Sequence, residues 1–531
     1  MLGSRLAARF LRVPLAVLAL AGSIGASAAG QAPDPEESAI AQLRKATVFR
    51  PNGLHHALLL ALRDLRDPAM RPFFESLVQA EHWSIQLDAI LGLAELSDKP
   101  LIDPWLLGRL RDERDRVDAL KVVLQLGMLD RERIEWLLAN QDTPAVGRVL
   151  LMAELFRLGG APDEAGLDRL AANPDPVIAG LASLVLGQIE AARGTPPSAA
   201  GAIARFARVL EALPPAERDS VIEELSTAAR RYGLSAAIDL FSFRVTGEPE
   251  APGPQESVVG MALVLDRPRG VELWKKVVGH ARPTDEDARR ADQARRVRFG
   301  LILLLNAAGT PPETFDLLPG TTDAAQAESL LLAMAAAGKA VASGTDPAPA
   351  MIALYDSGHR RSARWVVEAA AALDLKDSRR VYRHILEPIG GRTPPTPERR
   401  NDAIDAAARL AVLDPQTLRE ILAAAEDDGP LQEVILLGLA NAQGDATGDL
   451  AASVRRIGMG RADSIALLVI ARDAARPGST RTLTDAELRQ LGIIAGGGGG
   501  VDETLRAQAA WLYLRLSGRL DRALPKLSAA P

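Results

Sequence analysis

Three of the six histidines in this chain lie close together in the sequence, and imidazole nitrogens are common metal ligands. His55 and His56 are adjacent, and His82 follows Glu81 near the next predicted turn. Adjacent residues on a helix point about 100° apart, and the HExxH spacing that directs two histidines to one metal does not occur. The pattern favours surface or packing roles for these histidines. A metal-binding or enzymatic role for His55, His56 and His82 is the alternative.

Arginine clusters are the second candidate for chemistry, because guanidinium groups bind anions. One predicted helix carries basic and acidic residues at i,i+3 and i,i+4 spacings: Arg289, Arg290, Arg295, Arg296 and Arg298 with Asp285, Glu286, Asp287 and Asp292. Such spacing stabilises an exposed helix face. A second basic stretch contains Arg360, Arg361, Arg364, Arg379, Arg380 and Arg383. We predict solvated helix faces in both places, with an anion-binding groove as the alternative.

Other motifs of catalysis or cofactor binding are missing from the sequence. The glycine run Gly496–Gly500 is not followed by the Lys-Ser/Thr pair of a phosphate-binding loop, so we predict a flexible linker. Serine, histidine and aspartate do not occur in a recognisable catalytic order, and no cofactor fingerprint is present. We therefore expect no enzyme activity, no cofactor, no catalytic residues and no metal ligands.

Composition limits the classes of partner. The chain has 62 basic and 68 acidic residues, and this mildly acidic balance gives no electrostatic basis for binding nucleic acid. Cysteine is absent, so disulfides cannot stabilise the fold. Only 4% of the residues are aromatic, whereas 47% are hydrophobic, with many alanines and leucines that favour helices. The composition is typical of closely packed helices.

The N-terminus predicts export. Arg5, Arg9 and Arg12 precede the apolar stretch Val13–Ile24, and Ala26-Ser27-Ala28 supplies a cleavage pattern. We expect a signal peptide over residues 1–29, cleaved near Ala28. An uncleaved anchor is the alternative, although the apolar stretch is shorter than the ~20 residues that a membrane-spanning helix needs. No later stretch is comparably long and free of charge. The mature chain is therefore expected to be periplasmic or secreted, with no membrane span after cleavage.

Apolar residues recur at a fixed interval of 31 positions, and this ladder predicts the elements that carry everything else. One ladder consists of Leu62, Leu93, Leu124, Leu155 and Leu186, and the other of Leu43, Phe74, Trp105, Trp136 and Leu167. An offset of 19 residues within each step suits two helices joined by a short turn. A fixed period of this length is the mark of stacked repeats that bury each other's apolar faces. We predict both tryptophans in the core and expect Trp83 to contact a partner.

Breaks in the pattern divide the chain into five predicted regions. A signal peptide over 1–29 precedes an N-terminal repeat array over 30–193, and residues 194–257 form a helical pair ending in a Pro/Gly-rich loop at 247–255. An irregular helical middle region over 258–397 follows, and a C-terminal helical array covers 398–531. Strand patterns are missing almost throughout.

The helix-starting motifs resemble those of HEAT repeats, in the short form of bacterial HEAT-like proteins. Asp175-Pro176-Val177 precedes a helix ending in Leu186-Gly187, and Asp88-Ala89-Ile90-Leu91-Gly92-Leu93-Ala94 has the character of a second repeat helix. The resemblance covers about residues 36–190 well and 398–517 loosely. The expected basic residue after the turn aspartate occurs only sporadically. The resemblance implies an all-α fold, a right-handed α-solenoid of stacked helix pairs, and a surface that binds other macromolecules.

We therefore expect a non-enzymatic scaffold of the bacterial cell envelope that binds protein partners. Second helices of such repeats normally line the concave face, and seven polar positions there are the expected contact residues: Gln86, Glu95, Lys121, Gln125, Glu154, Arg157 and Gln188. A purely structural protein that self-associates through its irregular middle region is a further alternative.

Overall fold

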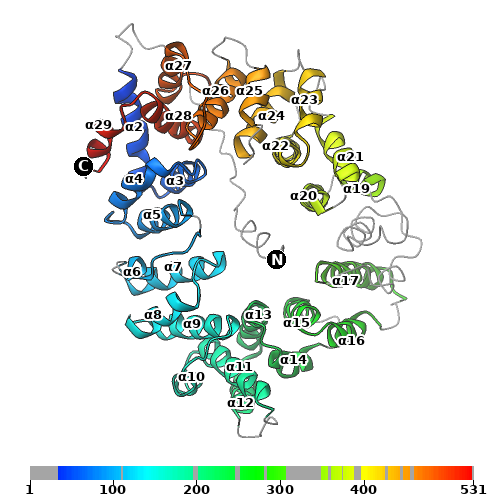
Figure 1. The fold of residues 1–531 in the computed structure, drawn as a ribbon. Helices are drawn as coiled ribbons and strands as arrows, with labels where there is room; N and C mark the ends of the chain where they lie inside the picture. The colour runs from blue at the N-terminus through cyan, green and yellow to red at the C-terminus, as the bar shows by residue number, and fades with distance from the viewer. Residues whose placement is uncertain are drawn as a thin grey trace. The chain divides into compact units, whose positions relative to one another are not determined.

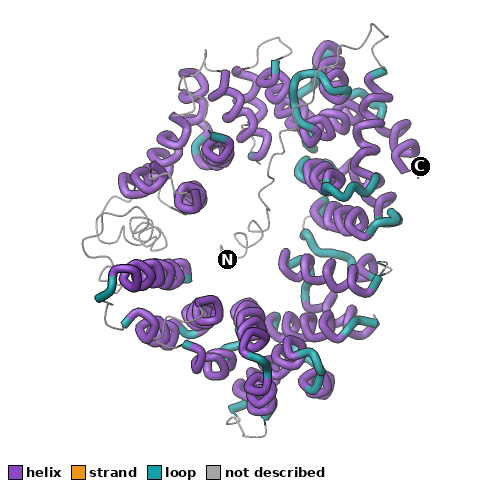
Figure 2. The backbone as a smooth tube through the Cα atoms, turned by 180° about the vertical axis from the view of Figure 1, so that it is seen from behind, coloured by secondary structure: helices purple, strands orange, loops and turns teal. Residues whose placement is uncertain are grey.

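The computed structural model describes residues 34–97, 99–108, 110, 112–140, 142–194, 201–245, 252–279, 284–306, 348–356, 360–372, 375–387, 396–424, 429–442, 447–454 and 460–528. The predicted signal peptide, residues 1–29, lies outside these ranges. Throughout the described ranges the chain forms helices joined by loops, without a strand, and this confirms the all-α prediction (Figure 2). None of the described helices is long and apolar enough to cross a membrane.

The chain divides into two compact units. The first contains residues 1–137 together with 403–531, and the second contains residues 138–402. These units cut across the predicted array of residues 30–193 and join its first part to the predicted C-terminal region. The five regions predicted from breaks in the sequence pattern remain predictions. Their boundaries mark changes of sequence pattern, whereas the two units are defined by how compactly the chain packs.

The N-terminal part of the first unit is a series of helix pairs. Its helices are α2 (Pro35–Thr47), α3 (Leu54–Arg63), η1 (Pro68–Met70), α4 (Arg71–Leu77), α5 (Trp83–Glu95), α6 (Pro104–Leu107), α7 (Glu113–Leu126) and α8 (Arg131–Asn140). Aspartate side chains cap several of them: Asp67 accepts from the Ala69 backbone N–H, and Pro68 occupies the first turn, where its missing N–H has no partner to lose. Asp-Pro starts at Asp34, Asp67 and Asp103 therefore mark where three of these pairs begin.

The C-terminal part of the first unit repeats the same design. Its helices are α22 (Pro397–Leu413), α23 (Pro415–Ala424), α24 (Gly429–Asn441), α25 (Thr447–Val454), α26 (Arg461–Ala474), α27 (Asp485–Ala495), α28 (Glu503–Leu516) and α29 (Leu520–Ser528). The second helices α24, α26 and α28 pack in sequence. This is the stacking that the repeat pattern predicted; the predicted right hand of the solenoid stays a prediction.

The first helix pair of the chain continues the stack formed by the last pairs. Helix α3 packs against α28 on one side and α5 on the other, while α2 packs against α27, α28 and α29 (Figure 1). The blue N-terminal helices therefore lie beside the red C-terminal ones. Each of these two groups of described helices covers an apolar face that the other would otherwise expose to water.

The second unit contains helices of the same kind. They are α9 (Ala145–Arg157), α10 (Glu164–Ala171), α11 (Pro176–Ala192), α12 (Ala202–Ala212), α13 (Pro215–Tyr232), α14 (Ala236–Phe241), η2 (Ser242–Arg244), α15 (Pro252–Leu265), α16 (Arg267–Val278), α17 (Glu286–Leu305), α19 (Ala348–Asp356), α20 (Arg360–Ala369), η5 (Ala370–Ala372) and α21 (Leu375–Leu386). The predicted loop at 247–255 is wrong in its last part, because α15 begins at Pro252. Proline is tolerated in the first turn of a helix, where its missing N–H has no partner to lose.

The residues of the apolar ladders are buried with three exceptions, Leu93, Trp105 and Trp136. Leu62, Leu124, Leu155 and Leu186 are at most 8% exposed, but Leu93 is half-buried. Leu43, Phe74 and Leu167 are inaccessible, whereas Trp105 is 52% exposed and Trp136 is half-buried. The core prediction for the tryptophans is therefore wrong. Helix α6 is a single turn, and the buried residues around it are Ile102, Leu107 and Leu110.

The glycine run Gly496–Gly500 is a packed turn between α27 and α28, and the linker prediction is wrong. Gly497, Gly499 and Gly500 have positive φ angles of 108°, 76° and 63°, which favour glycine. A Cβ on Gly498 would lie 2.6 Å from Ile493 Cγ2. The Gly500 carbonyl accepts a hydrogen bond from Arg461 at 2.9 Å. Glycine is needed here for close approach and backbone geometry.

Candidate functional site

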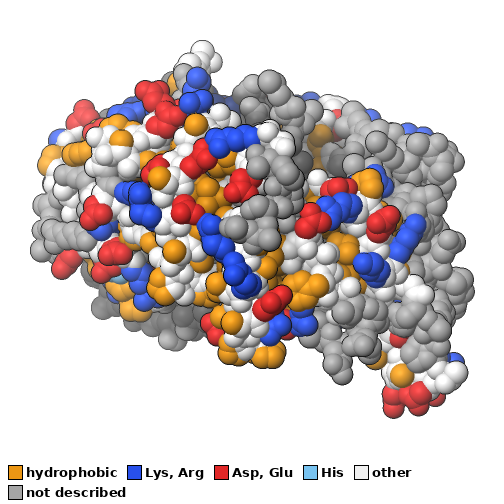
Figure 3. Space-filling model, turned by 90° about the horizontal axis from the view of Figure 1, so that it is seen from below, with side chains coloured by type: hydrophobic (Ala, Val, Ile, Leu, Met, Phe, Trp, Pro, Cys, Tyr) orange, Lys and Arg blue, Asp and Glu red, His pale blue; other side chains and the backbone are white. Residues whose placement is uncertain are grey.

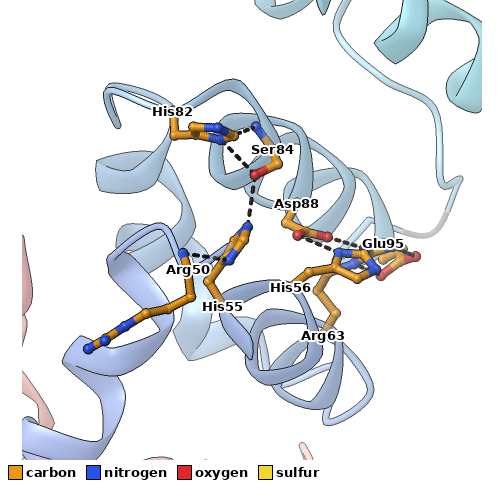
Figure 4. Close-up of polar contacts among 8 residues, drawn as sticks. All are labelled: Arg50, His55, His56, Arg63, His82, Ser84, Asp88 and Glu95. Atoms are coloured by element: carbon orange, nitrogen blue, oxygen red, sulfur yellow. Dashed lines mark hydrogen bonds and ion pairs between the residues drawn. The ribbon is translucent and has the colours of Figure 1, made fainter. Parts of the chain in front are cut away.

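The histidines singled out in the sequence lie where α3 faces α5 (Figure 4). Gly53, in the left-handed region at φ 74°, starts α3 and places His55 and His56 in its first turn. His82 caps α5, and Ser84 lies in the first turn of that helix. The two helices of successive repeats therefore bring residues from three short segments together.

His55, Ser84 and His82 form one chain of hydrogen bonds. The Arg50 backbone N–H donates to His55 Nδ1 at 3.1 Å, so the hydrogen of the neutral ring must lie on Nε2. His55 Nε2 lies 2.9 Å from Ser84 Oγ, which lies 2.8 Å from His82 Nδ1. His82 Nδ1 also accepts the Ser84 backbone N–H at 3.2 Å. Every hydrogen then has one assignment: His55 donates to Ser84, and Ser84 donates to His82.

Burial favours the neutral form of His55 in this cluster. The residue is 3% exposed, and burial lowers the pKa of its imidazole, although Asp88 partly opposes the shift. Phe49, 43% exposed, stacks on His82 with ring centroids 3.7 Å apart. The His82 and Trp83 rings are 6.4 Å apart, so half-buried Trp83 extends the same aromatic surface.

His56 belongs to a separate ionic network on the other side of α3. Its Nδ1 lies 2.8 Å from Asp88 Oδ2, and the hydrogen bond to Asp88 raises the pKa of His56. Arg63 donates to Asp88 Oδ1 at 2.9 Å and to Glu95 at 2.7 and 3.0 Å. Asp88 is 2% exposed and Arg63 is 7% exposed, so the pair is buried. Burial opposes ionisation of Arg63, but Glu95 and Asp88 raise its pKa overall.

The structure separates the three histidines of the metal hypothesis. His55 and His82 both turn toward the Ser84 hydroxyl, whereas His56 turns to Asp88 (Figure 4). Within the described ranges, no three His, Asp or Glu side chains are grouped as metal ligands would be. This geometry fixes the direction of the hydrogen bonds among His55, Ser84 and His82, and it joins α3 to α5.

The seven predicted contact residues fall into two groups. Gln86, Glu95, Glu154 and Gln188 are used internally: they bond to the Ala80 carbonyl, to Arg63, to Arg157, and to Ser235 and Ala236, respectively. Lys121, Gln125 and Arg157 have exposed positions. Lys121 and Gln125 lie one helical turn apart on α7, which buries Leu120, Val123 and Leu124 on its other side.

The first arginine cluster is less exposed than predicted. Arg296 donates to Asp292 at 2.8 Å, four residues earlier, but both residues are 8% exposed. Arg298 pairs with Glu256 of α15 at 3.0 Å, which joins two helices. The solvated-face prediction is therefore wrong for Arg296 and holds for Arg289, which is exposed. On the face seen in Figure 3, basic and acidic side chains are interspersed.

Sequence reasoning missed Ser84, Phe49 and the pairing of Arg63. A signal for the pairing exists: His56 and Asp88 are 32 positions apart, and so are Arg63 and Glu95. Arg133 bonds to the Ile102 carbonyl at a separation of 31. On α3 and α5, charged residues one repeat apart therefore face each other.

Comparisons with known proteins leave the family open. No family model matches the chain, and no curated protein matches it. One solved-structure match is a chain in a homology model of the full-length AP-3 complex in an intermediate open conformation. The match covers 92% of this chain and 94% of that chain, with 12% sequence identity and a TM-score of 0.38. A TM-score this low supports no conclusion about the family or the function of the chain.

Proposed function

We propose that this chain is a non-enzymatic protein-binding scaffold of the bacterial cell envelope. The observation that carries the proposal is a pair of exposed polar side chains on α7, Lys121 and Gln125, on a helix that buries Val117, Leu120, Val123 and Leu124. A helix that buries one side in the stack and exposes a polar side offers an extended surface for another protein. The predicted signal peptide supports the envelope setting.

The charges on α7 favour a partner that binds a surface of mixed basic, acidic and neutral polar side chains. Lys121 is paired at 3.8 Å with Asp118, and both side chains are about half exposed at 50% and 44%. Exposed pairs of this kind contribute little to stability, so they can exchange partners at low cost. Gln125 adds a neutral donor and acceptor on the next turn.

Site-specific photocrosslinking in the native host tests the binding surface. Gln125 is replaced by benzoylphenylalanine in the full-length chain, and Glu132, exposed on the neighbouring α8, carries the same group in a matched control. We expect a discrete polypeptide adduct from position 125 and none from position 132. Equal adducts from both positions, or none from position 125, contradict the proposed surface.

Cell fractionation tests the compartment separately. The expected result is a chain in the envelope or medium whose N-terminal residue lies just after Ala28. A cytoplasmic chain that begins at Met1 contradicts the envelope setting and leaves the binding surface to be judged by crosslinking alone.

A further inference from the structure

We propose that residues 48–53, the connector between α2 and α3, form a pH-sensitive clasp that acid releases from the first turn of α3. The connector is held by two contacts that depend on histidine. Its Arg50 N–H donates to His55 Nδ1, and its Phe49 ring stacks on His82. Its remaining hydrogen bonds, such as Gly53 N–H to the Arg50 carbonyl and Leu54 N–H to Asn52, are local.

The clasp works only with a neutral His55. Protonation would place a hydrogen on Nδ1, so that two N–H donors would face each other across the 3.1 Å contact with Arg50. The bond would be lost and replaced by repulsion. His82 has the same requirement at Nδ1, which accepts from both the hydroxyl and the backbone N–H of Ser84. A proton added to His55 therefore breaks the first link in the ordered chain of hydrogen bonds.

Charged neighbours of His55 come from both packed helices. On α3, His56 lies beside it and lowers its pKa; from α5, His82 also lowers it, and Asp88 raises it. Asp88 is already engaged by Arg63 and His56, which leaves it a poor stabiliser of a second cation. Burial is the largest effect and also favours the neutral ring.

The two adjacent histidines respond to acid in opposite directions. The lowered pKa of His55 gives stability that is present above about pH 6.5, the unfolded value, and is lost as the pH falls through the folded pKa. The raised pKa of His56 gives stability that is present below the unfolded pKa and is lost as the pH rises. Acid therefore releases the connector while the His56–Asp88 contact between α3 and α5 strengthens, so the response is local.

Hydrogen exchange of the Arg50 amide tests the clasp in the full-length protein. Protection is measured at about pH 7.5 and pH 5.5 and corrected for the intrinsic exchange rate. We expect protection to fall in acid, because protonation of His55 removes the acceptor of the Arg50 N–H. His55→Asn keeps an acceptor near the Nδ1 position without a titrating ring, so its protection should not change. The matched control His56→Asn should respond like the unsubstituted protein.

Constant protection in the unsubstituted protein overturns the proposal, as does an equal loss in His55→Asn. Imidazole nitrogen NMR of the unsubstituted protein keeps the test independent of the variants' folding. We expect the Nε2–H form of neutral His55 at pH 7.5, and its loss together with Arg50 protection in acid. An Nδ1–H form, or a charged ring at pH 7.5, overturns the proposal.

Discussion

Trp511 donates its indole N–H to Asp67 Oδ2 at 2.8 Å across a sequence separation of 444 residues. Trp511 in α28 is inaccessible to solvent, and Asp67 is 5% exposed at the start of η1. The same carboxylate caps η1 through Ala69 and lies 3.6 Å from Arg515. One buried acid thus joins the end of the chain to the turn that starts its second repeat.

Trp511→Phe should lower the free energy of unfolding of the first unit by about 2–3 kcal/mol. It removes the donor and leaves a buried carboxylate oxygen with only Arg515 beside it, and hydrogen bonds to charged groups contribute about 1.5–3 kcal/mol. Denaturant unfolding gives the magnitude, and hydrogen exchange should show faster exchange in both α28 and η1. Trp105→Phe, at a residue 52% exposed, is the control and should stay within about 0.5 kcal/mol. Equal effects of the two substitutions would argue against the junction.

Docking of α2 on α28 should weaken in acid. Burial opposes the shift, but hydrogen bonds from Gln42 and Lys45 lower the pKa of Glu503 below its ordinary value. The resulting stability is present above about pH 4.5, the unfolded value, and is lost as the pH falls through the folded pKa. Because the Glu503 side chain is 36% exposed, solvent screening limits the effect to about 1 kcal/mol or less.

The Glu503→Gln variant separates this effect from other acid transitions. It keeps an amide oxygen for Gln42 and removes the titration, so the exchange of α2 amides should lose the part of its pH dependence that begins below about pH 4.5. An unchanged pH dependence in the variant would assign the transition to other carboxylates.

The sequence predicted helix pairs and most of their buried residues, because a repeated unit presents the same apolar face each time. It did not predict that α2–α3 pack on α27–α28. The repeating apolar residues show that the last helix pair of a stack has an apolar face to bury. They carry no information on which segment of the chain packs against that face. The prediction that Trp105 is buried was wrong for a related reason. A ladder position predicts burial only when the surrounding helix is long enough to hold the residue on the apolar face, and α6 is a single turn.

The sequence predicted that the three histidines lie near one another, but it did not predict which residues they contact. Sequence proximity placed His55, His56 and His82 near one another, and the 100° rotation per residue correctly indicated that His55 and His56 diverge. The role of Ser84 could not be predicted, because its contacts depend on the angle at which α5 meets α3. Repeat spacing did contain the pairing of Arg63 with Glu95, 32 positions on.

Gly92→Ala should destabilise the first unit by about 1–3 kcal/mol. A Cβ at this position would lie 2.8 Å from two ring atoms of Phe74, which is inaccessible and has no free space to move into. Thermal or denaturant unfolding measures the loss. Gly429→Ala is the matched control in the same unit, because a Cβ at that position would meet no other atom within 4 Å. If Gly92→Ala proved as mild as the control, α4 and α5 would not approach as closely as described.

Asp88→Ala should lower the free energy of unfolding by about 1.5–3 kcal/mol, because it removes a buried acceptor of Arg63, which is only 7% exposed, and leaves Glu95 as the remaining carboxylate partner. Asp118→Ala removes an exposed partner of Lys121 and should cost less than about 0.5 kcal/mol. The decisive comparison is the double variant Arg63→Met with Asp88→Leu. Replacing both charges by apolar groups removes the desolvation penalty along with the ion pair, so the double variant should be more stable than Asp88→Ala. A double variant that is less stable than Asp88→Ala would mean that the ion pair itself, through its links to His56 and Glu95, is what stabilises the contact between α3 and α5.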